Sequence, residues 1–156
     1  MGRRAQFRMS TVVVMAGFAF GITPGAMGEA AAGEVLPGPV AATVVRVIDG
    51  DTVRVRALVW LGSTVEVDVR LAGIDAPELR GRCAREKQLA ATARDALRVM
   101  LGDGPVALRD VRYGKYAGRV VARIMAPNGD DAADALRAQG LARAYGGGKR
   151  AQWCGA

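Results

Sequence analysis

The sequence contains no histidine. This absence excludes nucleophilic sites built on a Ser-His or Cys-His pair, zinc sites that need imidazole ligands, and acid–base chemistry by imidazole. Any catalysis must therefore use carboxylates, arginine, lysine, tyrosine, or a metal ion held by oxygen ligands.

Aromatic residues are also scarce. They make up 5% of the 156 residues, whereas hydrophobic residues as a whole make up 51%. This balance predicts a core of valine, leucine, isoleucine and alanine, and the length suits one domain. The formal charge is +7, and it falls to +4 when Arg3, Arg4 and Arg8 are left out of the count. The remaining charge mildly favours a polyanionic partner such as nucleic acid or an anionic lipid.

The first 28 residues are typical of a secretory signal. A basic start precedes an apolar run at 11–22, and the small residues at 26–28 form a cleavage site. The apolar run is shorter than the about 20 residues that usually span a bilayer, and an uncleaved membrane anchor is the alternative interpretation. We therefore expect an exported protein, periplasmic or secreted, whose mature form does not associate with a membrane.

The residues after the signal divide into a lead-in and one domain. Residues 29–39 are rich in alanine, glycine and proline without periodicity, which predicts a flexible lead-in to a domain at 40–156. Alternating and β-branched runs in the domain predict strands, and helical spacing predicts helices. The predicted strands are 42–48, 52–61, 64–73, 106–111 and 119–125; the predicted helices are 84–101 and about 130–139; residues 141–145 are short and extended.

The turns and caps fix how these elements connect. Asp49-Gly50 predicts a hairpin between the first two strands, and Asp130 or Asp131 is the expected N-cap of the second helix, with Gly140 as its stop. Three strands, a helix, two strands and a helix are the order of an OB-fold. We therefore predict an α+β, mainly β domain: a five-stranded barrel with a helix inserted between strands three and four and a second helix after strand five. Such barrels commonly bind oligonucleotides or oligosaccharides.

The chain has two cysteines, Cys83 and Cys154. An even pair in an exported protein favours a disulfide, and two free thiols are the alternative. The bridge would close a loop of about 70 residues and contribute roughly 4 kcal/mol in the chain-entropy model, less any strain. A metal or catalytic role is not expected, because no histidine or further thiol is available to either cysteine.

One stretch, residues 70–78 (RLAGIDAPE), places a cation and two carboxylates around the end of a predicted buried strand. Asp75 and Glu78 flank Pro77, and a proline there continues neither a helix nor a strand ladder. Asp51, directly after the first hairpin turn, adds a third carboxylate on a segment that flanks an adjacent strand. Each motif alone is more typical of a turn or a solvated loop.

The combination with Arg70 and Arg119 suits phosphodiester hydrolysis. That reaction needs a positioned water, neutralisation of the pentacoordinate phosphate, and relief of charge on the departing oxygen. A hard divalent cation on carboxylate and carbonyl oxygens supplies the second need, and a free carboxylate accepts the proton of the water. Guanidinium groups supply paired hydrogen bonds to the phosphate.

Three motifs resemble the staphylococcal nuclease (thermonuclease) family over about residues 42–145. They are residues 47–53 (VIDGDTV), residues 70–78 (RLAGIDAPE) and residues 115–119 (KYAGR); residues 138–142 (AQGLA) match the end of the second helix. The third motif has one residue more than the usual KYGR. Most of the family's third helix is missing, and residues 146–154 replace it.

The resemblance implies a role for each matching position. It implies calcium ligands at Asp51, Asp75 and the backbone carbonyl of Ala76, and a general base or water-orienting group at Glu78. It implies phosphate binding at Arg70 and Arg119. The nucleotide pocket would include Lys115, Tyr116 and Tyr145.

The implied activity is calcium-dependent endonucleolytic cleavage of DNA and RNA that leaves 3′-phosphate ends. We expect a monomer without a stable protein partner. One alternative is an OB-fold module that binds nucleic acid without catalysis. Another is a periplasmic structural or carbohydrate-binding OB-fold protein, although paired arginines are hard to explain in that case.

Overall fold

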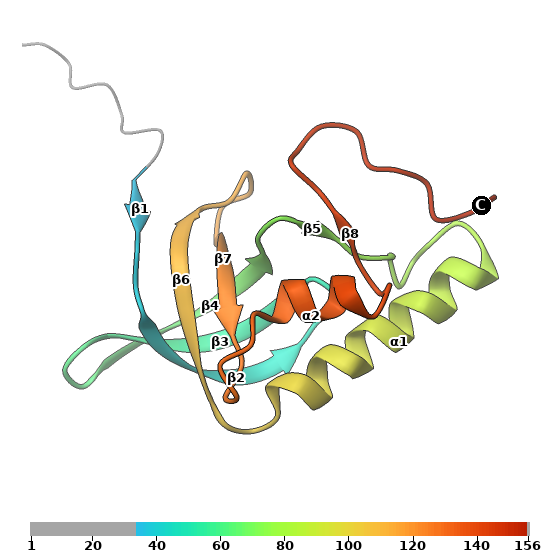
Figure 1. Cartoon of the computed structure of the whole chain (residues 1–156). Helices are drawn as coiled ribbons and strands as arrows, with labels where there is room; N and C mark the ends of the chain where they lie inside the picture. The colour runs from blue at the N-terminus through green and yellow to red at the C-terminus, as the bar shows by residue number, and fades with distance from the viewer. Residues whose placement is uncertain (1–33, 156) are drawn as a thin grey trace, which may run out of the picture. The chain divides into compact units, whose positions relative to one another are not determined.

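The computed structural model describes residues 34–155 (Figure 1). The predicted signal at 1–28 lies outside the described residues, as do residues 29–33 of the lead-in. Within residues 34–155, none of the helices has the length and apolar character needed to cross a bilayer.

The described chain forms a closed five-stranded barrel. Strands β2 (Val40–Val47), β3 (Thr52–Trp60) and β4 (Ser63–Leu71) are consecutive and antiparallel. Strand β7 (Arg119–Met125) pairs parallel to β4, and β6 (Pro105–Tyr113) pairs antiparallel to both β7 and β2. This strand order closes the barrel and confirms the predicted OB-fold.

The barrel strands follow from alternation in the sequence. Val53 and Val55 are fully buried inside the barrel, while Arg54 and Arg56, which alternate with them, remain outside. Arg54 lies opposite Asp68 on β4, and the two side chains form a bidentate ion pair at 2.7 and 3.0 Å. This hydrogen-bonded pairing lowers the pKa of Asp68. The pair therefore fixes the register on the polar face of the strands.

Two helices cover one side of the barrel, α1 (Ala84–Leu101) and α2 (Ala132–Ala138), and they lie next to each other (Figure 1). The apolar face of α1 buries Ala93, Leu97 and Leu101 in the same core as the barrel strands. Asp131 is the N-cap of helix α2, and its carboxylate accepts the N–H groups of two residues in the first turn. Both helices were predicted, and α2 is shorter than its predicted range.

Three short strands were not predicted as paired elements. β1 (Val35–Leu36) lies in the segment predicted to be a lead-in and pairs with β6. β5 (Ile74–Asp75) pairs antiparallel with β8 (Arg143–Ala144), and Asp75 lies opposite Arg143. This second small sheet joins the chain after α2 to the middle of residues 70–78.

Candidate functional site

Three segments bring Asp51, Arg70 and Asp75 together. Asp51 lies in the turn before β3, and its carbonyl accepts the N–H of Leu71 at 2.8 Å. Arg70 lies opposite Thr52 across the β3–β4 ladder, and Asp75 ends β5. Asp51 and Asp75 are only 3% and 4% exposed. Two carboxylates are therefore held out of water at one edge of the barrel.

Arg70 bridges the two buried aspartates. Its Nη1 lies 2.7 Å from Asp51 Oδ1, and its Nη2 lies 3.7 Å from Asp75 Oδ1. Nη2 also donates to the carbonyl of Ile74 at 3.5 Å. These contacts orient the guanidinium before any ligand arrives.

The charge of Asp51 is poorly solvated. Burial raises the pKa of this carboxyl to about 6; Arg70 opposes the shift and Asp49 adds to it. The Thr52 hydroxyl donates to Asp51 Oδ1 at 2.9 Å, and the Ala76 N–H donates to Oδ2 at 3.4 Å. A further cation beside Asp51 would favour its charged form.

The oxygen atoms at this edge fit a hard divalent cation. Asp75 Oδ1 is buried and accepts no hydrogen bond within the described residues, while Oδ2 accepts the indole N–H of Trp153 at 3.4 Å. Asp51 supplies a second buried carboxylate. Ala76, also buried, follows Asp75 directly and contributes a backbone carbonyl to the same segment. Carboxylate and carbonyl oxygens are the ligands that calcium takes in proteins.

Glu78 differs from the two aspartates because half of its side chain is exposed. It follows Pro77, which is fully buried, so the backbone of this loop is held against the core while the carboxylate faces outward. A carboxylate in contact with water can accept a proton from a water molecule beside it.

Sequence reasoning missed Arg150. Its Nε lies 2.7 Å from Asp75 Oδ1, without the geometry of a hydrogen bond, and its Nη2 lies 3.9 Å from Asp51 Oδ2. Its Nη1 donates a short hydrogen bond to Glu78 Oε1. One guanidinium therefore contacts all three carboxylates predicted for the site.

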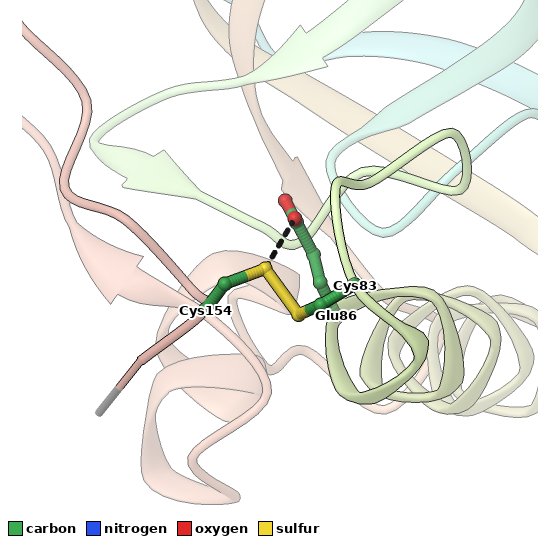
Figure 2. A group of neighbouring side chains, drawn as sticks. All are labelled: Cys83, Glu86 and Cys154. Carbon is green, nitrogen blue, oxygen red and sulfur yellow. Dashed lines mark hydrogen bonds between the residues drawn. A yellow bond between two sulfur atoms is a disulfide. The ribbon is translucent and has the colours of Figure 1, made fainter.

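The signal that could have located Arg150 is the cysteine pair. Cys83 and Cys154 form a disulfide, as predicted, and it holds the C-terminal chain beside the start of α1 (Figure 2). Arg150 lies four residues before one cysteine, and Glu78 lies five residues before the other. A bridge between these positions brings the two side chains into the same region.

Figure 2 also shows Glu86 beside the disulfide. Its Oε2 lies 3.4 Å from Cys154 Sγ, and this is a contact only, because a disulfide sulfur has no proton to donate. The carboxylate is buried and accepts the N–H of Arg82 at 2.9 Å. Both sulfur atoms are bonded to each other, so these three residues are not a thiolate metal site.

Arg119 is on the neighbouring part of the barrel and not among the carboxylates. It begins β7 opposite Asp68, and Val121, two residues on, lies opposite Arg70. Arg119 and Arg70 therefore share a face of the sheet. The Arg119 guanidinium stacks over the ring of Tyr116 at 5.0 Å. Within residues 34–155 it forms no ion pair with the three carboxylates of the site.

The predicted nucleotide-pocket residues divide between two places. Lys115 and Tyr116 lie next to Arg119, with the Lys115 amino group 5.9 Å from the Tyr116 ring. Tyr145 lies after β8; its N–H donates to Gly73 and its hydroxyl donates to the carbonyl of Gly148 at 2.8 Å. The structure thus gathers Asp51, Arg70, Asp75 and Glu78. Lys115, Tyr116 and Arg119 form a separate group, and Tyr145 holds the C-terminal chain.

The fold and the site define a class of protein: a five-stranded OB barrel with two buried carboxylates and one arginine between them at one edge. A family model described as "Staphylococcal nuclease homologue" matches residues 68–152, and the chain belongs to this family. The match includes residues 70–78, residues 115–119 and Arg150, whereas Asp51 lies before it. No curated protein matches the chain. Family membership suggests a nuclease, with nucleic acid as its substrate.

Proposed function

We propose that the protein is a calcium-dependent endonuclease that hydrolyses the phosphodiester bonds of DNA and RNA and leaves 3′-phosphate ends. The observation that carries the proposal is the arrangement of Asp51, Arg70 and Asp75. Two buried carboxylates share one arginine, and Asp75 Oδ1 has no hydrogen bond among the described residues. Burying two carboxylates this close is costly unless a cation compensates them.

Asp51, Asp75 and the carbonyl of Ala76 would hold the calcium ion. When bound, the ion would neutralise charge on the scissile phosphate. Arg70 supplies the fixed part of phosphate recognition, because its contacts with Asp51 and the Ile74 carbonyl orient the guanidinium in advance. The entropy needed to orient the Arg70 guanidinium is therefore lost during folding and not when the phosphate binds.

Glu78 would take the proton from the attacking water. Its exposed carboxylate can reach solvent, and the buried Pro77 holds its backbone. Arg119 would bind the same phosphate and stabilise the leaving oxygen. Lys115, Tyr116 and Tyr145 would bind the nucleotide, and the exposed ring of Tyr116 offers a surface on which a base can stack.

A second candidate function is an OB-fold module that binds nucleic acid without cleaving it. The position of Arg150 favours this candidate, because its guanidinium contacts the three carboxylates that catalysis would require. The separation of Arg119 from those carboxylates favours it too. Both candidates bind nucleic acid, and only the first cleaves it.

Incubation with plasmid DNA and with RNA, in calcium or in chelator, separates the two candidates. A nuclease should fragment both polymers in calcium and neither in chelator. An Asp75→Asn preparation purified in parallel should be inactive, which excludes a contaminating nuclease. Binding of both polymers without calcium-stimulated cleavage would support the non-catalytic module and contradict the proposal.

We also propose that residues 1–28 are a secretory signal and that the mature protein is an exported monomer. The disulfide supports export, because such bonds persist mainly in oxidising compartments. N-terminal sequencing of the exported protein would test the cleavage site, and a start before residue 26 would contradict it.

A further inference from the structure

The guanidinium of Arg150 lies where a divalent cation would have to bind. Its Nε lies 2.7 Å from Asp75 Oδ1, the buried oxygen that has no hydrogen bond in the described chain. It also reaches Asp51 at 3.9 Å and Glu78. A metal ion bound by Asp51 and Asp75 would contact the same Asp75 oxygen as this guanidinium. The two cations cannot occupy that position at the same time.

The chain around Arg150 is anchored on its C-terminal side. Trp153 is buried and donates its indole N–H to Asp75, and Arg143 stacks on the Trp153 ring at 3.9 Å. Arg143 also donates to the carbonyl of Gln152 at 3.0 Å. The disulfide at Cys154 completes the anchor. Arg150 is therefore kept within reach of the carboxylates by covalent and packing contacts.

The Arg150 side chain has room to leave the aspartates. Its side chain is 39% exposed, and it borders a cavity of about 440 Å³ between the C-terminal chain and the loop before α1. Glu78, which also lines this cavity, is half exposed. The guanidinium can thus keep Glu78 as a partner while Asp51 and Asp75 take another cation.

We propose that Arg150 is an internal competitor of the divalent cation at Asp51 and Asp75, and that it sets the apparent metal affinity of the protein. The Cys83–Cys154 disulfide holds Arg150 near the two aspartates and so raises its effective concentration at the site. The inference rests on the proposed function in one respect, since it takes the two aspartates as metal ligands. Only molecules in which Arg150 has left the aspartates can bind the metal. If Arg150 occupies the site about 90% of the time, the apparent Kd for the metal is about tenfold higher.

The test is calcium binding measured by isothermal titration calorimetry without nucleic acid. Arg150→Gln removes the competitor and should tighten calcium binding about tenfold relative to the parent. Lys149→Gln is the matched control: it removes one neighbouring charge from the same cavity, and Lys149 forms no ion pair within residues 34–155. It should change the affinity by less than about twofold. Thermal melting of each variant checks that it is folded.

Reduction of the disulfide gives an independent measurement. Reduction frees the C-terminal chain and should tighten calcium binding by the parent, while the affinity of Arg150→Gln should stay the same. Equal or weaker binding by Arg150→Gln would overturn the inference, and calcium-stimulated cleavage by the parent would then leave the proposed function standing. Reduction that shifts both proteins alike would overturn the role of the tether. Absence of calcium binding in every form would count against the inference and the metal site together.

Discussion

Arg70 makes its contacts with groups that are themselves fixed. Asp51 is hydrogen-bonded by Thr52 and by the backbone of Ala76, and the Ile74 carbonyl belongs to the small β5–β8 sheet. The planar guanidinium reaches Asp51, Asp75 and this carbonyl from one position. An ammonium group has a different geometry and cannot reproduce these paired contacts.

Arg70→Lys should therefore lower cleavage of DNA strongly while preserving the fold. We expect a loss of about 100-fold or more in kcat/KM, because the loss of one oriented donor to a transition state commonly has this effect. Arg56→Lys is the matched control, since Arg56 lies on the same face of the barrel and, within residues 34–155, forms an ion pair only with the exposed Glu66. Steady-state cleavage kinetics measure both. Parental kinetics in Arg70→Lys would contradict its role at the phosphate.

Helix α1 joins the core through one face. Leu97 is fully buried, whereas Val99, two residues later on the same helix, is 83% exposed. This contrast follows from the 3.6-residue period and allows a matched pair of substitutions.

Leu97→Ala should lower the free energy of unfolding by about 2–5 kcal/mol, because truncation of a buried leucine removes apolar contacts and leaves a cavity. Val99→Ala should change it by less than about 0.5 kcal/mol, as expected for a surface position. Denaturant unfolding followed by circular dichroism measures both values. Similar values for the two variants would show that α1 does not pack as described.

The predictability of each element depended on its length. The bounds of α1 and of β7 matched the sequence prediction, because each carries several periods of apolar residues. Strands β5 and β8 have two residues each, which is too short to show any period, and only their pairing defines them. The burial of Glu86 was also missed, because the helical pattern predicts that a charged residue is exposed. Its contacts with the Arg82 N–H and with the disulfide can be seen only in the folded structure.

At the level of the whole molecule, the closed barrel decides which predicted residues meet. Asp51, Arg70 and Asp75 were predicted from motifs on neighbouring segments, and the β3–β4 ladder places them together. Arg150 could not be assigned from its own surroundings, a glycine-rich basic segment without a motif. Its position depends on Trp153 and on the disulfide that joins Cys154 to Cys83, 71 positions earlier in the chain.

Glu78 is the one of the three predicted carboxylates that the folded barrel leaves in contact with water. Asp51 and Asp75 are buried, so among the three predicted carboxylates Glu78 alone is exposed to water. Its contact with Arg150 maintains the side chain beside the aspartates. The proposed hydrolysis therefore depends on this one group as the proton acceptor.

Single-turnover cleavage of plasmid DNA in calcium by Glu78→Gln tests this claim most directly. The variant should bind DNA as the parent does and cleave it about 100- to 10,000-fold more slowly, the range typical of a lost general base. Glu66→Gln, a similarly exposed glutamate on the barrel, should cleave at the parental rate. Cleavage by Glu78→Gln at the parental rate would contradict the account of the site.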